Sequence, residues 1–352
     1  MTMLRPALIA VTAFALGACA STQIGSSDEY ERVSMNKVFP YPEEAETSQR
    51  QVSVVLSQSY TSELPRTVVG EAMAQAQTTL ARFMTEAGAG IADSGIDAGD
   101  LFTKGVRSSP ETGDEVPPQG PSHALITSFS KYEYTREYAK PVNLFFKSEE
   151  EMAKKPGKCT HRVEFTLAMA VYEIPPAGHP MEMVKSFTLA DSGEDKIGDL
   201  DTSCPYSEGE KRVQFEEVLR EALECMELPI RNAFAGSGYI TEHRRQIDGN
   251  KNVFKTGLGS SRGAQKGLDV EVFRVLVSTA EDGSRSLQEI KIAEGVISNQ
   301  IEADSSWILI DLEKVRQPIL QGDLARIVYR KGLGSNLPGF GRSCSGVLSE
   351  HQ

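Results

Sequence analysis

The fold is decided most clearly at residues 162–173, which have the sequence RVEFTLAMAVYE. Every second side chain in this stretch is apolar, and a similar alternation returns a few residues later. The apolar positions are Val163, Phe165, Leu167, Met169 and Val171, followed by Met181, Met183, Phe187 and Leu189. A period of two residues is typical of a β-strand with one buried face. The sequence therefore predicts a long antiparallel pair of strands that needs a covering layer on one side.

Two helical patterns flank this pair of strands. Apolar residues recur every three or four positions between residues 69 and 84, which predicts an amphipathic helix ending near Gly88. A second helix is predicted from the capping-box residues Ser207 and Glu210 to about Gly236, with a kink or an early stop at Pro229.

The elements assemble into two predicted domains. A short strand at 52–56, the helices and the strand pair predict an N-terminal α/β domain over residues 51–246, with a mixed sheet and two long helices. Short strands separated by glycine turns follow, at 270–277, 289–297, 307–312 and 324–329. They predict a small C-terminal β-barrel or sandwich over 247–331, with a loose tail at 332–352. The expected fold class is α+β.

Residues 1–18 have the features of an export signal. Arg5 supplies a positive charge, and the apolar run at 7–16 is too short to cross a bilayer as a helix. The run ends in Leu16-Gly17-Ala18-Cys19, which resembles the lipobox of bacterial lipoproteins. That resemblance implies lipid attachment to Cys19, with acyl chains such as palmitate that anchor the protein to a membrane. An ordinary cleaved signal with an incidental Cys19 is the alternative.

The residues after the lipidation site predict the location of the protein. Ala20 stands where an Asp would imply retention in the inner membrane, so the resemblance implies the periplasmic face of the outer membrane. Residues 19–50 are polar and acidic with little periodicity, and we expect a flexible tether there.

Four further cysteines would lie in an oxidising compartment, where disulfides persist. Three pairings are open to them. We expect Cys159 to pair with Cys204, because the first opens a strand and the second lies in the loop that returns beside it. Cys225 falls on the apolar face of a helix, where a buried free thiol is expected.

The layout resembles that of bacterial envelope-assembly lipoproteins. Residues from about 50 to 245 are similar to the curli secretion lipoprotein, and residues from about 250 to 331 to the C-terminal domain of the flagellar assembly protein T. Leu258-Gly259-Ser260 and Gln321-Gly322-Asp323-Leu324 are the turn residues that carry the second similarity. The resemblance implies a role in envelope or surface-structure assembly or secretion.

The curli resemblance also implies a ring of subunits that forms a secretion pore from transmembrane hairpins. The strands at 163–171 and 181–189 have nearly the required length. Lys185 would then face lipid near mid-bilayer, at a cost of about 2 to 4 kcal/mol. A periplasmic accessory or ring component is therefore the preferred expectation, and the oligomeric pore is the alternative.

Candidate catalytic and metal-binding residues are few. Gly259-Ser260-Ser261-Arg262-Gly263 matches the pattern of a hydrolase nucleophile elbow, but the stretch leads into a strand and only His351 follows it. A serine hydrolase using Ser261 is kept as an alternative. Five carboxylates are expected in one loop, at Asp191, Glu194, Asp195, Asp199 and Asp201. They predict at most a weak Ca²⁺ site, since their spacing does not match an EF-hand. His161, His179 and His243 are too scattered to form a metal site.

These observations predict a non-enzymatic, lipid-anchored protein without cofactor or metal. The net charge of −12 argues against nucleic acid as a partner and against binding of anionic lipid through basic residues. The expected partners are the membrane, through Cys19, and other envelope proteins, bound at exposed faces of the small β domain or in a homo-oligomeric ring.

Overall fold

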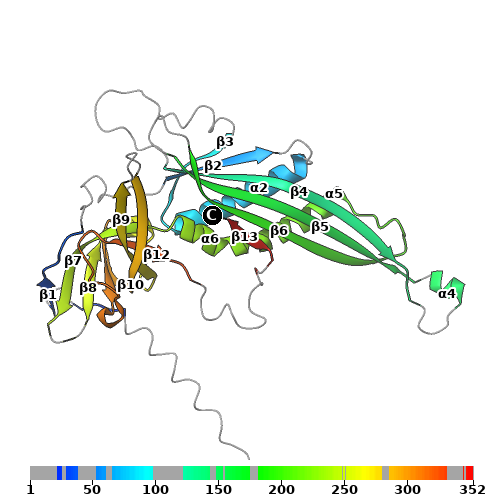
Figure 1. Cartoon of the computed structure of the whole chain (residues 1–352). Helices are drawn as coiled ribbons and strands as arrows, with labels where there is room; N and C mark the ends of the chain where they lie inside the picture. The colour runs from blue at the N-terminus through cyan, green and yellow to red at the C-terminus, as the bar shows by residue number, and fades with distance from the viewer. Residues whose placement is uncertain are drawn as a thin grey trace, which may run out of the picture. The chain divides into compact units, whose positions relative to one another are not determined.

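The computed structural model describes residues 22–25, 29–38, 53–60, 66–97, 122–142, 148–153, 155–174, 181–247, 249, 251–279, 285–330, 344 and 346–351. Figure 1 shows the chain as two compact units. The barrel unit comprises residues 1–51 and 235–330, and the sheet unit comprises 52–234 and 331–352.

The sheet unit is built on six strands in the order β13-β6-β5-β4-β2-β3. In chain order they are β2 (Ser53–Tyr60), β3 (Gly90–Asp97), β4 (His123–Ala139), β5 (Gly157–Glu173), β6 (Glu182–Asp199) and β13 (Leu348–His351). β2 runs parallel to β3 and β4, and the other neighbours are antiparallel. β5 and β6 form the predicted antiparallel pair.

Helices cover one face of this sheet. The helical elements are α2 (Arg66–Glu86), the short α4 (Glu149–Ala153), α5 (Glu208–Leu223), the single turn η2 (Glu224–Met226) and α6 (Glu227–Ala233). α5 begins at the predicted capping box, where Ser207 Oγ accepts a hydrogen bond from the Glu210 N–H and the Glu210 carboxylate accepts one from the Ser207 N–H. The 3₁₀ turn ends α5 before Pro229, which a continuous helix would not accommodate.

The core of the sheet unit lies between β5 and the helices. The alternate residues from Val163 to Val171 are all buried, as are Phe83, Phe129, Phe187 and Phe215. Phe129, Phe165 and Phe215 meet edge to face with ring centroids 5.6 to 6.1 Å apart. The period-two pattern thus faces the helices α2 and α5, whose apolar stripes complete a single core.

The C-terminal segment is tied to the sheet unit, so the prediction of a loose tail is wrong at its end. Cys344 forms a disulfide with Cys225, and Leu348–His351 pairs with Ser186–Leu189 as β13. The prediction of a free thiol at Cys225 is wrong for the same reason. A partner 119 residues away in sequence leaves no local pattern.

The barrel unit is a closed barrel of six strands. Its strands are β7 (Ser237–Gln246), β8 (Asn252–Thr256), β9 (Asp269–Thr279), β10 (Arg285–Ile301), β11 (Ser306–Ile310) and β12 (Leu324–Val328). Pairing of β7 with β8 closes the order β7-β12-β9-β10-β11-β8. Single turns of 3₁₀ helix follow β8 as η3 (Ser260–Arg262) and β11 as η4 (Leu312–Lys314).

Residues expected in the tether also belong to the barrel. β1 (Tyr30–Val33) pairs with β7, and Tyr30 is buried with Ile24 and Val253. The expectation of a flexible tether is therefore wrong for residues 30–33. A strand of four residues is too short to show periodicity, and it exists because the edge of β7 receives it.

The predicted fold class, an N-terminal α/β domain with two long helices followed by a small β domain, is wrong. Strand accounts for 50% of the described residues and helix for 23%, so the protein is mostly β, with a closed six-stranded barrel in its C-terminal half. The helical share is small because α2 and α5 cover only one face of a larger set of strands. The strands β4, β5 and β6 are 17, 17 and 18 residues long and make most of the sheet unit.

Candidate binding groove between β6 and α5

Among the described residues of the sheet unit, a hollow lies between the end of β6 and the helix α5. It has a volume of about 690 Å³ and is open to solvent. β6 contributes Gly193, Glu194, Asp195 and Ile197, and α5 contributes a stripe of residues three or four apart, Glu210, Val213, Gln214, Glu217, Val218 and Glu221. We refer to these residues, with Tyr206, Ser207 and Gly209, as the groove.

Carboxylates dominate the polar lining of the groove. Asp195, Glu210, Glu217 and Glu221 line it, and Glu194 borders it on β6 with its side chain on the opposite face of the strand from Asp195. Hydrogen bonding from Lys196 lowers the pKa of the Glu194 carboxyl, and hydrogen bonding from Ser207 lowers the pKa of Glu210. Both groups are therefore ionised at neutral pH. Basic residues contact some of these carboxylates: Lys196 lies 2.7 Å and Arg162 3.9 Å from Glu194, and Arg220 lies 3.9 Å from Glu217.

Apolar side chains stand between the carboxylates. Val213 is 59% exposed and Ile197 is 38% exposed, although both are large apolar residues. They come from the two sides of the groove, α5 and β6. The groove therefore offers both negative charge and apolar contact.

An aromatic stack closes one end of the groove. Tyr206 stacks on the buried ring of His161 with centroids 4.0 Å apart, and Tyr134 lies 2.6 Å from His161 through its hydroxyl. Tyr206 also donates a hydrogen bond to Asp195 at 3.2 Å. Burial and that carboxylate raise the pKa of Tyr206 to about 12, so its hydroxyl remains a donor.

The disulfide between Cys159 and Cys204 holds this end in place. It joins β5 to the loop after β6, with an Sγ–Sγ distance of 2.02 Å, and it is the pairing expected from the sequence. Tyr206 follows two residues later. The bond therefore restricts where the aromatic end of the groove can lie.

The wall formed by β6 is also an edge of the sheet. β5 pairs with β6 along its whole length, whereas β13 covers the other side only at Ser186–Leu189. Within the described residues no strand pairs with that side of Ser192–Asp199. Among the described strands, the groove therefore lies beside an edge of the sheet.

The acidic residues 191–201 were expected in a loop, and that expectation is wrong. Most of them lie on β6, which extends to Asp199. Alternation along a strand sends neighbouring side chains to opposite faces. Among the described residues no group of three or more metal-ligating side chains is close enough to hold an ion.

Ser261, the candidate nucleophile, is engaged in hydrogen bonds within the barrel unit. This residue lies in η3, and its Oγ donates a hydrogen bond to the Ala303 carbonyl at 2.7 Å. Its other neighbour is Asp304, with Oδ1 at 3.4 Å. A nucleophilic serine needs a base at that position. The turn leads into β9 rather than a helix, unlike a nucleophile elbow.

The other candidate residues lie apart. His243 stacks on Phe254 in the barrel and contacts Asn252 at 3.0 Å, whereas His161 belongs to the sheet unit. Cys19 and His179 lie outside the described residues. None of the described helices is both long and apolar enough to cross a membrane.

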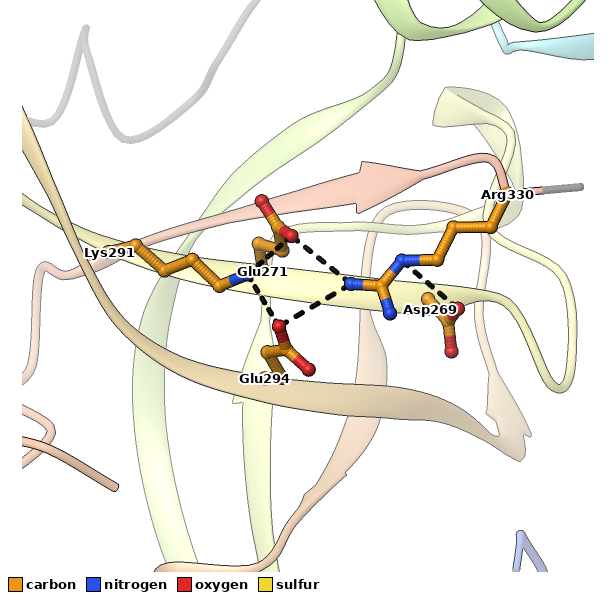
Figure 2. A network of polar contacts seen from close by, with 5 residues as sticks. All are labelled: Asp269, Glu271, Lys291, Glu294 and Arg330. Atoms are coloured by element: carbon orange, nitrogen blue, oxygen red, sulfur yellow. Dashed lines mark hydrogen bonds and ion pairs between the residues drawn. The ribbon is translucent and has the colours of Figure 1, made fainter. Parts of the chain in front are cut away.

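The barrel carries one prominent charged network, drawn in Figure 2. Glu271 on β9 stands directly opposite Glu294 on β10. Lys291 contacts both carboxylates, and Arg330 reaches Glu271 at 3.1 Å and Asp269 at 3.6 Å. Like charges facing each other across strands are destabilising, and the two cations offset that repulsion. These charges satisfy one another, which leaves little for a ligand.

Neither a protein-family model nor a curated protein matches the chain. Among solved structures, it is similar to a neuraminyllactose-binding hemagglutinin homolog from Helicobacter pylori, with 10% identity and a TM-score of 0.33 over 55% of this chain and 90% of that one. It is also similar to the PelC dodecamer from Paraburkholderia phytofirmans, with 13% identity and a TM-score of 0.23 over 57% of this chain and 96% of that one. A third similar structure is the hypothetical protein CT253 from Chlamydia trachomatis, with 11% identity and a TM-score of 0.25 over 51% of this chain and 98% of that one.

Similarities at these TM-scores carry no argument about fold or function. None of the three proteins is named as a curli or flagellar protein. The resemblance to those two families therefore stays a prediction.

Sequence reasoning missed the groove. It placed the partner surface on the small β domain, whereas the groove lies in the sheet unit. The signal that could have found it is the helical recurrence of Glu210, Val213, Glu217 and Glu221, on a face of α5 that the core does not use.

Proposed function

We propose that the protein is a non-enzymatic lipoprotein of the outer membrane that faces the periplasm and binds another envelope protein during assembly or secretion. The groove between β6 and α5 is the observation that carries the proposal, because it combines a concave wall, exposed apolar side chains and an open strand edge. Partner binding commonly uses such features. Lipid on Cys19 would keep the groove close to the membrane.

The two alternatives receive less support. A pore made from the hairpin of β5 and β6 would turn one strand face to lipid, but the face that carries Phe165 and Leu167 is buried in a core with Phe215 of α5. A hydrolase using Ser261 would need a base that takes the hydroxyl proton, whereas the Ser261 Oγ donates its closer hydrogen bond to the Ala303 carbonyl at 2.7 Å. Replacing Ser261 with Ala should therefore leave the function unchanged.

Lipid attachment is tested in the bacterium that encodes the protein. Labelling with a clickable palmitate analogue should mark the wild type in the outer-membrane fraction and should not mark Cys19→Ala. Native protein recovered from the periplasm without acyl groups would overturn the proposal.

Partner binding is tested with a photo-crosslinking amino acid placed at Val213 in the full chain. A discrete adduct with one envelope protein is expected, and it should disappear when Cys19→Ala is combined with the probe. Ile247 is the matched control, because it is 58% exposed and lies in the barrel unit. Equal adducts from both positions, or none from Val213, would contradict the proposal.

A further inference from the structure

The edge of β6 beside the groove presents backbone groups in a regular order. The Ala190 N–H donates a hydrogen bond to the Val347 carbonyl on the side where β13 lies. Backbone groups of alternate residues point the same way in an antiparallel sheet. Since the register with β5 is regular from Lys185 to Asp199, Glu194, Lys196 and Gly198 direct their N–H and C=O groups away from β5.

These backbone groups lie on the same side of β6 as the groups that pair with β13. β13 stops at Leu348, and within the described residues no strand extends it along β6. A bound strand could add there in the register that β13 begins. The odd-numbered residues Gly193, Asp195 and Ile197 alternate with these and line the groove. Every second side chain of an added strand would therefore enter the groove.

We propose that the groove binds an extended basic segment of a partner protein, which adds as a strand to the edge of β6 at Ser192–Gly198. This inference rests on the proposed function and specifies its partner. The groove-facing side chains of the segment are Lys or Arg opposite Asp195, Glu210 and Glu217, with aliphatic residues at Val213 and Ile197. Backbone hydrogen bonds supply affinity, and the groove supplies specificity.

Charge selects this occupant over a second copy of the chain. The opposite edge of the same sheet is β3, with the sequence GIADSGID. Pairing β3 of one copy with β6 of another would place this acidic strand beside a groove lined by acidic residues. Like charges across neighbouring strands repel. A strand with lysines at alternate positions meets the opposite charge.

The test measures binding of a fluorescent, capped octapeptide of alternating Lys and Val to the purified full chain. Binding that weakens with added salt is expected, and a Glu-Val peptide of the same length should not bind. A Lys peptide of equal charge that contains two prolines should also fail, because proline cannot complete the strand ladder.

Two variants separate the charge from the backbone. Glu217→Lys with Glu221→Lys should weaken Lys-Val binding at least tenfold, whereas Glu216→Lys, which lies on the same helix outside the groove, should change it less than twofold. Lys196→Pro removes one outward N–H at an edge, where proline is tolerated, and should also weaken binding at least tenfold. Lys196→Ala keeps that N–H and removes a positive charge, so it should bind at least as well as the wild type.

Several results would overturn the inference. One is equal binding by Lys196→Pro, with its fold verified by circular dichroism. Another is equal binding of the Glu-Val peptide. A third is the detection of dimers or rings by light scattering in the absence of peptide, if Lys196→Pro abolishes these oligomers. The edge of β6 would then bind a second copy of the chain. If the Lys-Val peptide fails to bind while the Val213 adduct persists in cells, this inference falls and the proposed function stands.

Discussion

Gly193 of β6 lies directly beneath Val218 of α5. A Cβ atom built on Gly193 would overlap the Cγ2 methyl of Val218. The missing side chain lets the helix approach the strand at this point, and Val218 belongs to the core of the sheet unit. The inner wall of the groove is therefore set by one close contact between a glycine and a valine.

Adding a methyl group at this contact should move the helix. We expect Gly193→Ala to lower the free energy of unfolding by about 1 to 3 kcal/mol, because overpacking forces neighbouring atoms apart. Urea denaturation followed by circular dichroism measures the loss. Gly198→Ala is the matched control on the same strand, since the nearest atom to its added Cβ is Pro156 Cβ at 3.7 Å, an ordinary contact. Equal stability of the two variants would contradict the packing argument.

The disulfide between Cys225 and Cys344 should contribute more stability than the one between Cys159 and Cys204. It spans 119 residues against 45, and a longer closed loop restricts the unfolded chain more. Replacing both cysteines of a pair with Ala should cost about 2 to 4 kcal/mol, with the larger loss for the longer loop.

Hydrogen exchange adds a local measure of the same bond. Without Cys225–Cys344, the amides of Leu348–His351 should exchange faster, because β13 would lose its covalent link and depend on its pairing with β6 and the packing of Leu348. The Cys159→Ala/Cys204→Ala variant should leave those amides protected. Unchanged protection in both would show that β13 does not depend on the bond.

Stability should fall as the pH drops below about 6.5. Burial lowers the pKa of His123 and of His243, so each prefers to be neutral in the folded protein. The unfolded chain binds a proton near the ordinary histidine pKa, and protonation then favours unfolding. The stability that the two neutral histidines contribute is fully present above the unfolded-state pKa. It is lost as the pH falls from that value toward the lowered pKa of the folded state.

Urea unfolding at pH 7.5 and at pH 5.5 checks this direction. His123→Gln combined with His243→Gln should show a smaller loss between the two values than the wild type. Glutamine keeps a hydrogen-bonding group without titrating. An equal loss in both proteins would assign the pH dependence to other groups.

Lys291 should stabilise the barrel by separating two facing carboxylates. Replacing it with Gln leaves Glu271 opposite Glu294 with only Arg330 between them. The expected loss is at most about 1 kcal/mol, because the network is partly exposed, and it should shrink at high salt. Lys314→Gln is the control, since its single ion pair with Asp311 is exposed. A salt-independent loss would point to packing instead of charge.

Local patterns predicted the individual elements well. The alternation around Phe165 became β5, and the capping box at Ser207 begins α5. Both signals act within a few residues, because they depend on strand pleat and on the first turn of a helix. The fold class was misjudged because the helices α2 and α5 cover only one face of a much longer set of strands.

The groove could not be predicted because it depends on which elements become neighbours. β13 comes from the far end of the sequence and covers β6 at Ser186–Leu189, whereas no described strand covers that side of Ser192–Asp199. The hollow exists because Gly193 lets α5 pack closely against β6 at one point. The acidic and apolar side chains of β6 and α5 that line the hollow leave the space between them open.

The amino-acid sequence alone determined where the longest helices and the central strand pair form, which of their faces are apolar, and that the chain has the features of an exported lipoprotein around Cys19. Only the tertiary structure decided that the barrel closes through β7 and β8, that Cys225 has a partner, and that part of β6 keeps an open edge beside α5. Periodicity is a property of neighbouring residues, whereas closure, pairing and edges depend on contacts between segments far apart in the chain.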